Sequence, residues 1–243
     1  MKILLIGESW SIHMIHSKGF DSFTSTKYEE GATYLISQLR AKDIEVDYFP
    51  AHQIQTGFDV NFDNYDAVII SDIGSNTFLL QNSTFYNLKT VPNTLVKLKD
   101  YVANGGGFMM IGGYLSFMGI EGKANYKNTV LDEVFPVEML DGDDRVEVPE
   151  GIRASYTDPE HETVKGFEGE PLFLGYNRVK ARQGAQTVMS VGDDPLLVFG
   201  TYKKGKTACF MSDCSPHWGC HEFMNWKHYT DLWVNSLKHI AKK

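Results

Sequence analysis

Residues 104–116 read Asn104-Gly-Gly-Gly-Phe-Met-Met-Ile-Gly-Gly-Tyr-Leu-Ser116 and give the clearest indication of the fold. The glycine run at the start ends the helical pattern of residues 94–103, because glycine stops a helix. The apolar run 108–111 then predicts a strand buried on both faces, as in a parallel sheet. A helix followed at once by a buried strand and a second glycine-rich turn indicates an α/β protein.

The same alternation continues in both directions along the chain. It predicts strands at residues 2–6, 45–49, 67–71, 108–111 and 206–211, helices at 28–42, 94–103 and 227–242, and a long polar loop at 8–27. Strands that alternate with helices form βαβ units around a mostly parallel sheet. We therefore expect one domain over residues 1–243, with a β-rich antiparallel insertion at about 134–200 that includes strands at 145–148, 186–191 and 196–201.

Composition excludes several classes of protein. The net charge of −8 argues against a nucleic-acid partner, because phosphate recognition requires a basic surface. No apolar run reaches the 18 residues that a membrane span requires, and the N-terminus does not resemble a signal peptide. Three cysteines are too few for a disulfide framework. These features favour a cytoplasmic protein, and no feature of the sequence calls for a cofactor.

Polar side chains follow the predicted strands at the edge where open α/β sheets bind ligands. These residues can contact a small polar ligand such as a sugar or a carboxylate, or they can cap the segments that follow the strands. The candidates are Glu8, Ser9, Trp10, Asp72, Gly74, Asn76, Gly112, Gly113, Ser116 and Trp218.

Two segments contain candidate catalytic residues. The sequence Gly112-Gly-Tyr114-Leu-Ser116 has the spacing of a nucleophile elbow, with Tyr114 at its apex. His217, which follows the last predicted strand, could act as a general base oriented by Asp213. Each has a structural alternative, in which Tyr114 lines the pocket and His217 is a buried, hydrogen-bonded histidine. A phenol with a pKa near 10 is a poor nucleophile, so the tyrosine argues against covalent catalysis.

A metal site is a further alternative. Histidine and cysteine are zinc ligands, and they gather in two places. The candidates are His13, His16, Cys214, His217, Cys220 and His221. Their spacing matches no established zinc pattern, so solvated or core positions are the competing interpretation.

Four segments together resemble a bacterial family of glutamine amidotransferase-like proteins. They are the stretches 2–10, 71–77, 111–117 and 213–219, and the resemblance covers nearly the whole chain. It implies a flavodoxin-like, class I glutamine amidotransferase-like sandwich. In active members of the wider superfamily, an elbow cysteine attacks glutamine, a histidine activates it, and a glutamate two residues beyond completes the triad. By that resemblance His217 occupies the histidine position, but Tyr114 replaces the cysteine and Gly219 the glutamate.

Three functions remain open on this evidence. The first is a pseudoenzyme that binds a small polar ligand and lacks glutaminase activity. The second is a divergent hydrolase that uses His217 and Asp213, with or without a metal. The third is a homo-oligomeric assembly protein, in which exposed aromatic residues or apolar strands of the insertion form the interface.

Overall fold

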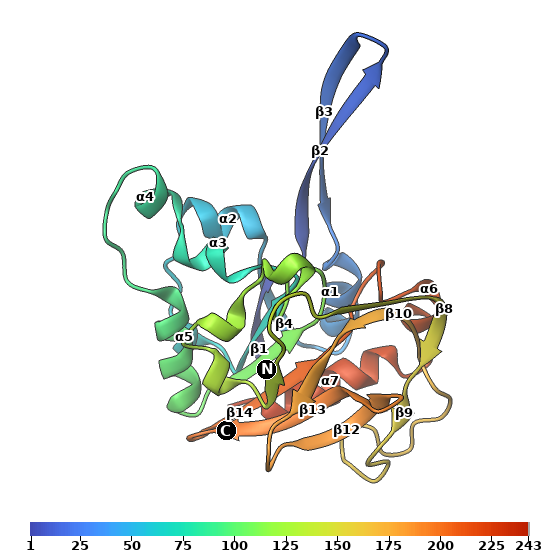
Figure 1. Ribbon diagram of the computed structural model, residues 1–243. Helices are drawn as coiled ribbons and strands as arrows, with labels where there is room; N and C mark the ends of the chain where they lie inside the picture. The colour runs from blue at the N-terminus through green and yellow to red at the C-terminus, as the bar shows by residue number, and fades with distance from the viewer. Residues whose placement is uncertain (243) are drawn as a thin grey trace.

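An eight-stranded sheet runs through the centre of this computed structural model, which describes residues 1–242 (Figure 1). The order of its strands is β4-β1-β5-β6-β14-β13-β12-β9. Their bounds are β1 Lys2–Gly7, β4 Glu45–Phe49, β5 Ala67–Ser71, β6 Gly107–Ile111, β9 Ser155–Tyr156, β12 Gln186–Val191, β13 Asp194–Tyr202 and β14 Gly205–Phe210.

The first five strands in this order are parallel, and the remaining three are antiparallel. Strands β5 and β6 are buried along their whole length, as expected for strands covered on both faces. The predictions of an α/β fold and of these strands are therefore confirmed to within one or two residues.

Two groups of helices cover the sheet. Helix α1 (Thr33–Arg40) packs against α7 (Tyr229–Ile240), whereas α2 (Ala51–Thr56), α3 (Ser75–Leu79) and α5 (Thr94–Ala103) pack together. The connection from β1 to β4 steps one way along the sheet, and those from β4 to β5 and β6 step the other way. Right-handed crossovers therefore place the two groups on opposite faces. The shorter helices are α4 (Asn82–Phe85), α6 (His221–Met224), η1 (Phe62–Asn64), η2 (Ile120–Gly122), η3 (Tyr126–Asn128) and η4 (Asp132–Val134).

The predicted loop at residues 8–27 is wrong, because this segment forms a long β-hairpin. Strands β2 (Ser9–Lys18) and β3 (Asp21–Glu30) pair in register and stand away from the body of the molecule (Figure 1). Gly19, at φ 63°, occupies the two-residue turn. The predicted helix at 28–42 consequently begins later, at Thr33, because residues 28–30 belong to β3.

The region at 134–200 contains short antiparallel strands. Strand β8 (Arg145–Arg153) pairs with β10 (Leu172–Asn177), and β7 (Val137–Met139) pairs with β11 (Val179–Ala181). The strands predicted at 145–148, 186–191 and 196–201 are found as β8, β12 and β13. Within residues 1–242, no helix has the length and apolar character needed to cross a bilayer.

Candidate functional site

Three acidic residues meet at the carboxyl edge of the parallel strands. Glu8 follows β1, Asp72 follows β5 and Asp213 lies three residues beyond β14, and they are 0%, 5% and 1% exposed. Glu8 accepts hydrogen bonds from the hydroxyls of Ser71 and Ser215, the latter at 3.0 Å. Glu8 and Asp72 also have positive φ angles of 49° and 41°. Such conformations are costly outside glycine, and they concentrate at functional sites.

Burial raises the pKa of all three carboxyl groups. Loss of hydration, reinforced by the nearby Asp72 carboxylate, raises the pKa of Glu8 to about 7. Burial raises the pKa of Asp72 to about 6, although the Leu115 N–H, at 2.6 Å, opposes this rise. The pKa of Asp213 is raised well above its usual value, first by burial and then by Glu8 and Asp72. The edge therefore binds protons at pH values where ordinary carboxylates are ionised.

The turn after β6 is not a nucleophile elbow. Its left-handed backbone is at Gly113, with φ 144°, and Tyr114 itself has no positive φ. No α-helix begins behind the turn, which leads into the three-residue η2. The expected strand–turn–helix context of an activated nucleophile is therefore missing.

Tyr114 packs among aromatic and charged side chains. Its ring meets the His217 ring edge-on, with centroids 4.3 Å apart, and the guanidinium of Arg145 lies 5.0 Å from its centroid. Its hydroxyl donates to Glu147 at 2.9 Å, and Trp218 Nε1 donates to the same carboxylate at 3.0 Å. Burial and the carboxylate of Glu147 raise the pKa of Tyr114. The phenol is consequently a poor candidate for a phenolate nucleophile.

His217 and Asp213 do not form the hydrogen bond that a catalytic base requires. Their closest atoms, Nδ1 and Oδ2, are 3.9 Å apart. Burial lowers the pKa of His217, whereas that of Asp213 is raised, so both groups favour their neutral forms. The His217 side chain is nevertheless 40% exposed and reaches the solvent at this edge.

A cavity of about 320 Å³ opens at the carboxyl edge, between the body and the base of the hairpin. Its wall consists of Trp10, Ile12, Glu29, Asp72, Tyr114, Pro216 and His217. A neighbouring cavity of about 650 Å³ shares Trp10, Glu29 and Pro216 with it. The first cavity brings together two of the predicted ligand contacts, Trp10 and Asp72, with Tyr114 and His217. Glu29 and Ile12 were not among the predicted contacts, because the sequence did not indicate that the hairpin would border the site.

Other predicted ligand contacts have structural roles. Ser9 Oγ accepts from the Ala51 N–H at 2.9 Å, and Ser116 Oγ bridges the Asp72 N–H and the Ile111 carbonyl at 3.1 and 2.6 Å. Gly74 is the N-cap of α3, and Asn76 lines a separate cavity near α4. Trp218 is 1% exposed and fixes Glu147.

A buried pair that sequence reasoning missed holds the turn in place. The Asn177 side chain bonds both the N–H and the carbonyl of Gly113, at 3.0 and 3.2 Å, and donates to Asp144 at 2.8 Å. Asp144 also accepts from the N–H groups of Met118 and Gly119 at 2.9 and 3.0 Å. In the sequence Asp144 follows Asp141-Gly-Asp143, a pattern typical of an exposed turn, so no local signal indicates this role.

The predicted metal set does not assemble within residues 1–242. His13 and His16 lie out on the hairpin, where they bond Thr26 and Ser25, and three-residue spacing on a strand points them to opposite faces. Cys220 donates to the Leu172 carbonyl, and His221 is exposed. The ligand atoms that do gather within 4.8 Å belong to Glu8, Asp213 and Cys214.

That group is better described as a hydrogen-bonded cluster than as a metal site. Both oxygens of Glu8 already accept hydrogen bonds from hydroxyl groups. Burial raises the pKa of the Cys214 thiol well above its usual range, which disfavours the thiolate that would bind a metal.

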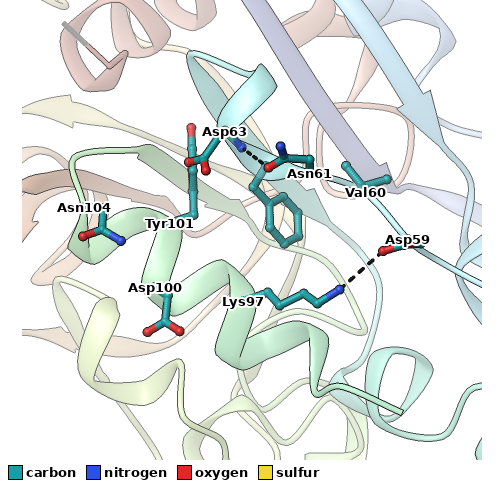
Figure 2. A pocket seen from close by; sticks show the side chains of 9 residues that line it. Asp59, Val60, Asn61, Asp63, Lys97, Asp100, Tyr101 and Asn104 are labelled. Carbon is teal, nitrogen blue, oxygen red and sulfur yellow. Dashed lines mark hydrogen bonds and ion pairs between the residues drawn. The ribbon is translucent and has the colours of Figure 1, made fainter.

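Another cavity, of about 370 Å³, lies at the opposite edge of the sheet (Figure 2). It is bordered by residues that precede β5 and β6, such as Asp63 and Asn104, and Lys97 pairs with Asp59 at its rim (Figure 2). Ligands of open α/β sheets bind at the carboxyl edge, so this amino-edge cavity is not our candidate site.

Comparisons with known proteins agree with this architecture. The family described as putative glutamine amidotransferase matches residues 2–242. Two solved structures of cytoplasmic proteins, from Salmonella typhimurium and from its strain LT2, are 65% and 61% identical, with TM-scores of 0.98 and 0.96. In both cases the match covers 100% of each chain. No curated protein matches the chain.

A more distant structure shows likeness of fold alone. A ThuA-like protein from Parabacteroides merdae is 12% identical, with a TM-score of 0.61, over 98% of this chain and 89% of its own.

Proposed function

This chain belongs to the putative glutamine amidotransferase family, and we propose that it binds a small polar ligand at the carboxyl edge and does not hydrolyse glutamine. We further propose that its fold is the flavodoxin-like, class I glutamine amidotransferase-like sandwich, in one domain. The parallel order β4-β1-β5-β6-β14, with helices on both faces, supports this assignment. The two Salmonella relatives are named cytoplasmic proteins, and we propose the same compartment for this chain.

Residues at the carboxyl edge and in the segment that follows β14 argue against glutaminase chemistry. By the resemblance of the sequence, Tyr114 takes the place of the superfamily's cysteine, and burial and Glu147 raise the pKa of its phenol. Cys209 and Cys214 are buried, with thiol pKa values raised well above the usual range by loss of hydration. A Cβ atom at Gly219 would lie 2.6 Å from the Asp213 carbonyl oxygen, so the triad glutamate has no room there.

The single observation that carries the proposal is the composition of the edge cavity. Asp72 and Glu29 offer hydrogen-bond acceptors, His217 offers a neutral imidazole, and Trp10 and Tyr114 offer ring surfaces. Pockets that combine aromatic walls with a few polar groups are the usual form of a small-molecule site. Two carboxyl groups disfavour an anionic ligand. A sugar or polyol can donate its hydroxyl groups to both carboxyl groups and stack on the rings, and we propose this ligand class.

Ligand screening by thermal shift, followed by calorimetry, tests the proposal. The panel comprises neutral sugars and polyols, amines, carboxylates and glutamine. We expect stabilisation by a polyhydroxylated compound, lost in Asp72→Asn and retained in His221→Ala, an exposed histidine outside the cavity. Stabilisation by carboxylates alone would contradict the assigned ligand class. Ammonia release from glutamine at an enzymatic rate, abolished by His217→Ala, would overturn the absence of glutaminase activity.

A divergent hydrolase is the second candidate, and the exposed, neutral His217 beside the cavity is the observation that favours it. A neutral imidazole can accept a proton from an attacking water. Chromogenic ester, amide and glycoside substrates test this function. Turnover that disappears in His217→Ala and persists in His221→Ala would establish it.

A further inference from the structure

The two strands of the β2–β3 hairpin pack closely against each other and have few contacts with the other elements. Its outer part exposes Ile15, Phe20 and Phe23 at 77%, 109% and 55%, and Met14 is 39% exposed. An isolated two-stranded hairpin is marginally stable in water, so a hairpin of this length requires a further packing surface. Exposed aromatic and apolar side chains on a projecting arm are typical of a protein interface.

The two outer edges of the hairpin differ in charge. Strand β2 has no carboxylate, no proline and a single charged residue, Lys18, at its outer end. Strand β3 has Asp21 at its outer end, with Lys27, Glu29 and Glu30 near its base. Soluble proteins usually protect a free strand edge with charges or proline, and the β2 edge between Trp10 and Ser17 lacks both. The β2 edge is therefore the one that can pair with another strand.

We propose that β2 pairs antiparallel with β2 of a second copy of this chain, which gives a four-stranded sheet across a two-fold axis. In a two-fold antiparallel pair, one residue of β2 faces its own copy across the axis. We place Met14, near the middle of β2, on this axis, so that Lys18 faces the partner's Trp10. Within each hairpin Trp10 is directly opposite Glu29. Lys18 thus approaches both an aromatic ring and a carboxylate of the partner molecule.

Charge complementarity favours this pairing. In the equivalent register through β3, with Ser25 on the axis, Asp21 would face the partner's Glu29, and like charges in facing positions are destabilising. In the β2 register Lys18 faces Trp10, and the carboxylate of Glu29 lies on the next strand. Because Trp10 and Glu29 also line the edge cavity, the partner's Lys18 adds a cation to its rim. The dimer is independent of any particular ligand, so it can be tested separately from the proposed function.

The mass of the full chain in solution, measured by light scattering after size exclusion, is the first test. We expect twice the chain mass of 27.4 kDa. Met14→Asp places two carboxylates against each other at the two-fold axis, and we expect the dimer Kd to rise about tenfold or more. Ser25→Asp is the matched control, because Ser25 faces Met14 within the hairpin but belongs to β3. It should remain a dimer.

Two further variants keep the proposal testable if Met14→Asp fails to fold. Met14→Cys should form a disulfide-linked dimer under mild oxidation, whereas Ser25→Cys should not. Lys18→Glu should weaken the dimer, and adding Glu29→Lys should restore it. A wild-type monomer at every accessible concentration would overturn the proposal. Equal disruption by Met14→Asp and Ser25→Asp, or cross-linking through Ser25→Cys alone, would overturn the assignment of the β2 edge.

Discussion

Asp144 determines the position of the turn that contains Tyr114. This 2%-exposed carboxylate accepts hydrogen bonds from two backbone N–H groups and from Asn177. We expect Asp144→Ala to lower the free energy of unfolding by about 3 kcal/mol, because it leaves several buried donors without a partner. Denaturant unfolding measures the change. Asp141→Ala, which removes a 93%-exposed side chain paired with Lys127, is the control and should cost about 1 kcal/mol or less.

His217 provides a direct test of the electrostatics of the cavity wall. Burial lowers its pKa, while the carboxylate of Glu147 raises it and the guanidinium of Arg145 lowers it further. We expect its imidazole to titrate below 6.5 when followed by NMR. Removal of the carboxylate in Glu147→Gln should move the midpoint lower still, since an attractive charge is lost. A higher midpoint in Glu147→Gln would show that the two groups do not interact as described.

Residues at strand ends were predictable from the sequence, and their partners were not. Glu8, Asp72 and Asp213 follow buried strands, so the topology of a parallel sheet brings them to one edge. Asn177 and Asp144 lie in the antiparallel region, and their contact with Gly113 depends on long-range packing. Strand periodicity carries no information about such contacts, which is why the sequence did not reveal this pair.

At the scale of elements, Gly112 lets the carboxyl ends of β6 and β14 approach each other. A Cβ atom there would lie 2.5 Å from the Met211 carbonyl oxygen and 2.8 Å from Asn177 Oδ1. We expect Gly112→Ala to cost about 3 kcal/mol or more, because backbone and a buried side chain must both move. Gly142→Ala is the control, since its Cβ atom meets nothing within 4 Å and only its φ of 101° opposes the change. A smaller loss for Gly112→Ala than for Gly142→Ala would refute this account.

The β2–β3 hairpin could not be predicted from the pattern of apolar residues. A strand is recognised when alternate residues face a core, but β2 is buried only at Ser9 and β3 has no buried residue. Their turn, Gly19-Phe20, is also weaker than the Asn-Gly or Asp-Gly signals of tight hairpins. In contrast, β5 and β6 lie in the core on both faces, and their apolar runs identified them directly.

At the scale of the whole molecule, the parallel strands bring three buried carboxyl groups to one edge of the sheet. Hydrogen bonds partly compensate for this burial. Ser71 and Ser215 donate to Glu8, and the Leu115 N–H donates to Asp72. These contacts only partly offset the loss of hydration, since the pKa values of both carboxyl groups are still raised. Ionisation of these carboxyl groups therefore lowers the stability of the fold. Functional sites commonly reduce stability in this way.

The pH dependence of stability follows from these raised values. The pKa of Glu8 rises from 4.5 to about 7 on folding, so the folded chain holds a proton that the unfolded chain has released. Its contribution to stability is full below pH 4.5 and is lost as the pH rises through about 7. Burial lowers the pKa values of His161, His217 and His228, which acts in the opposite direction below pH 6.5. A comparison of wild type with Glu8→Gln removes this opposing contribution, because both proteins contain the same histidines.

We therefore expect Glu8→Gln to be more destabilising at pH 5 than at pH 8. The difference between the two proteins should change by up to about 3 kcal/mol over this range, because each tenfold change in proton affinity is worth about 1.4 kcal/mol. Urea unfolding at several pH values gives the two free energies. Glu138→Gln, which replaces an exposed carboxylate on β7, is the control and should show a nearly constant difference. A constant difference for Glu8→Gln as well would mean that Glu8 is ionised in the folded protein at pH 5. That result would contradict the raised pKa of this carboxyl group.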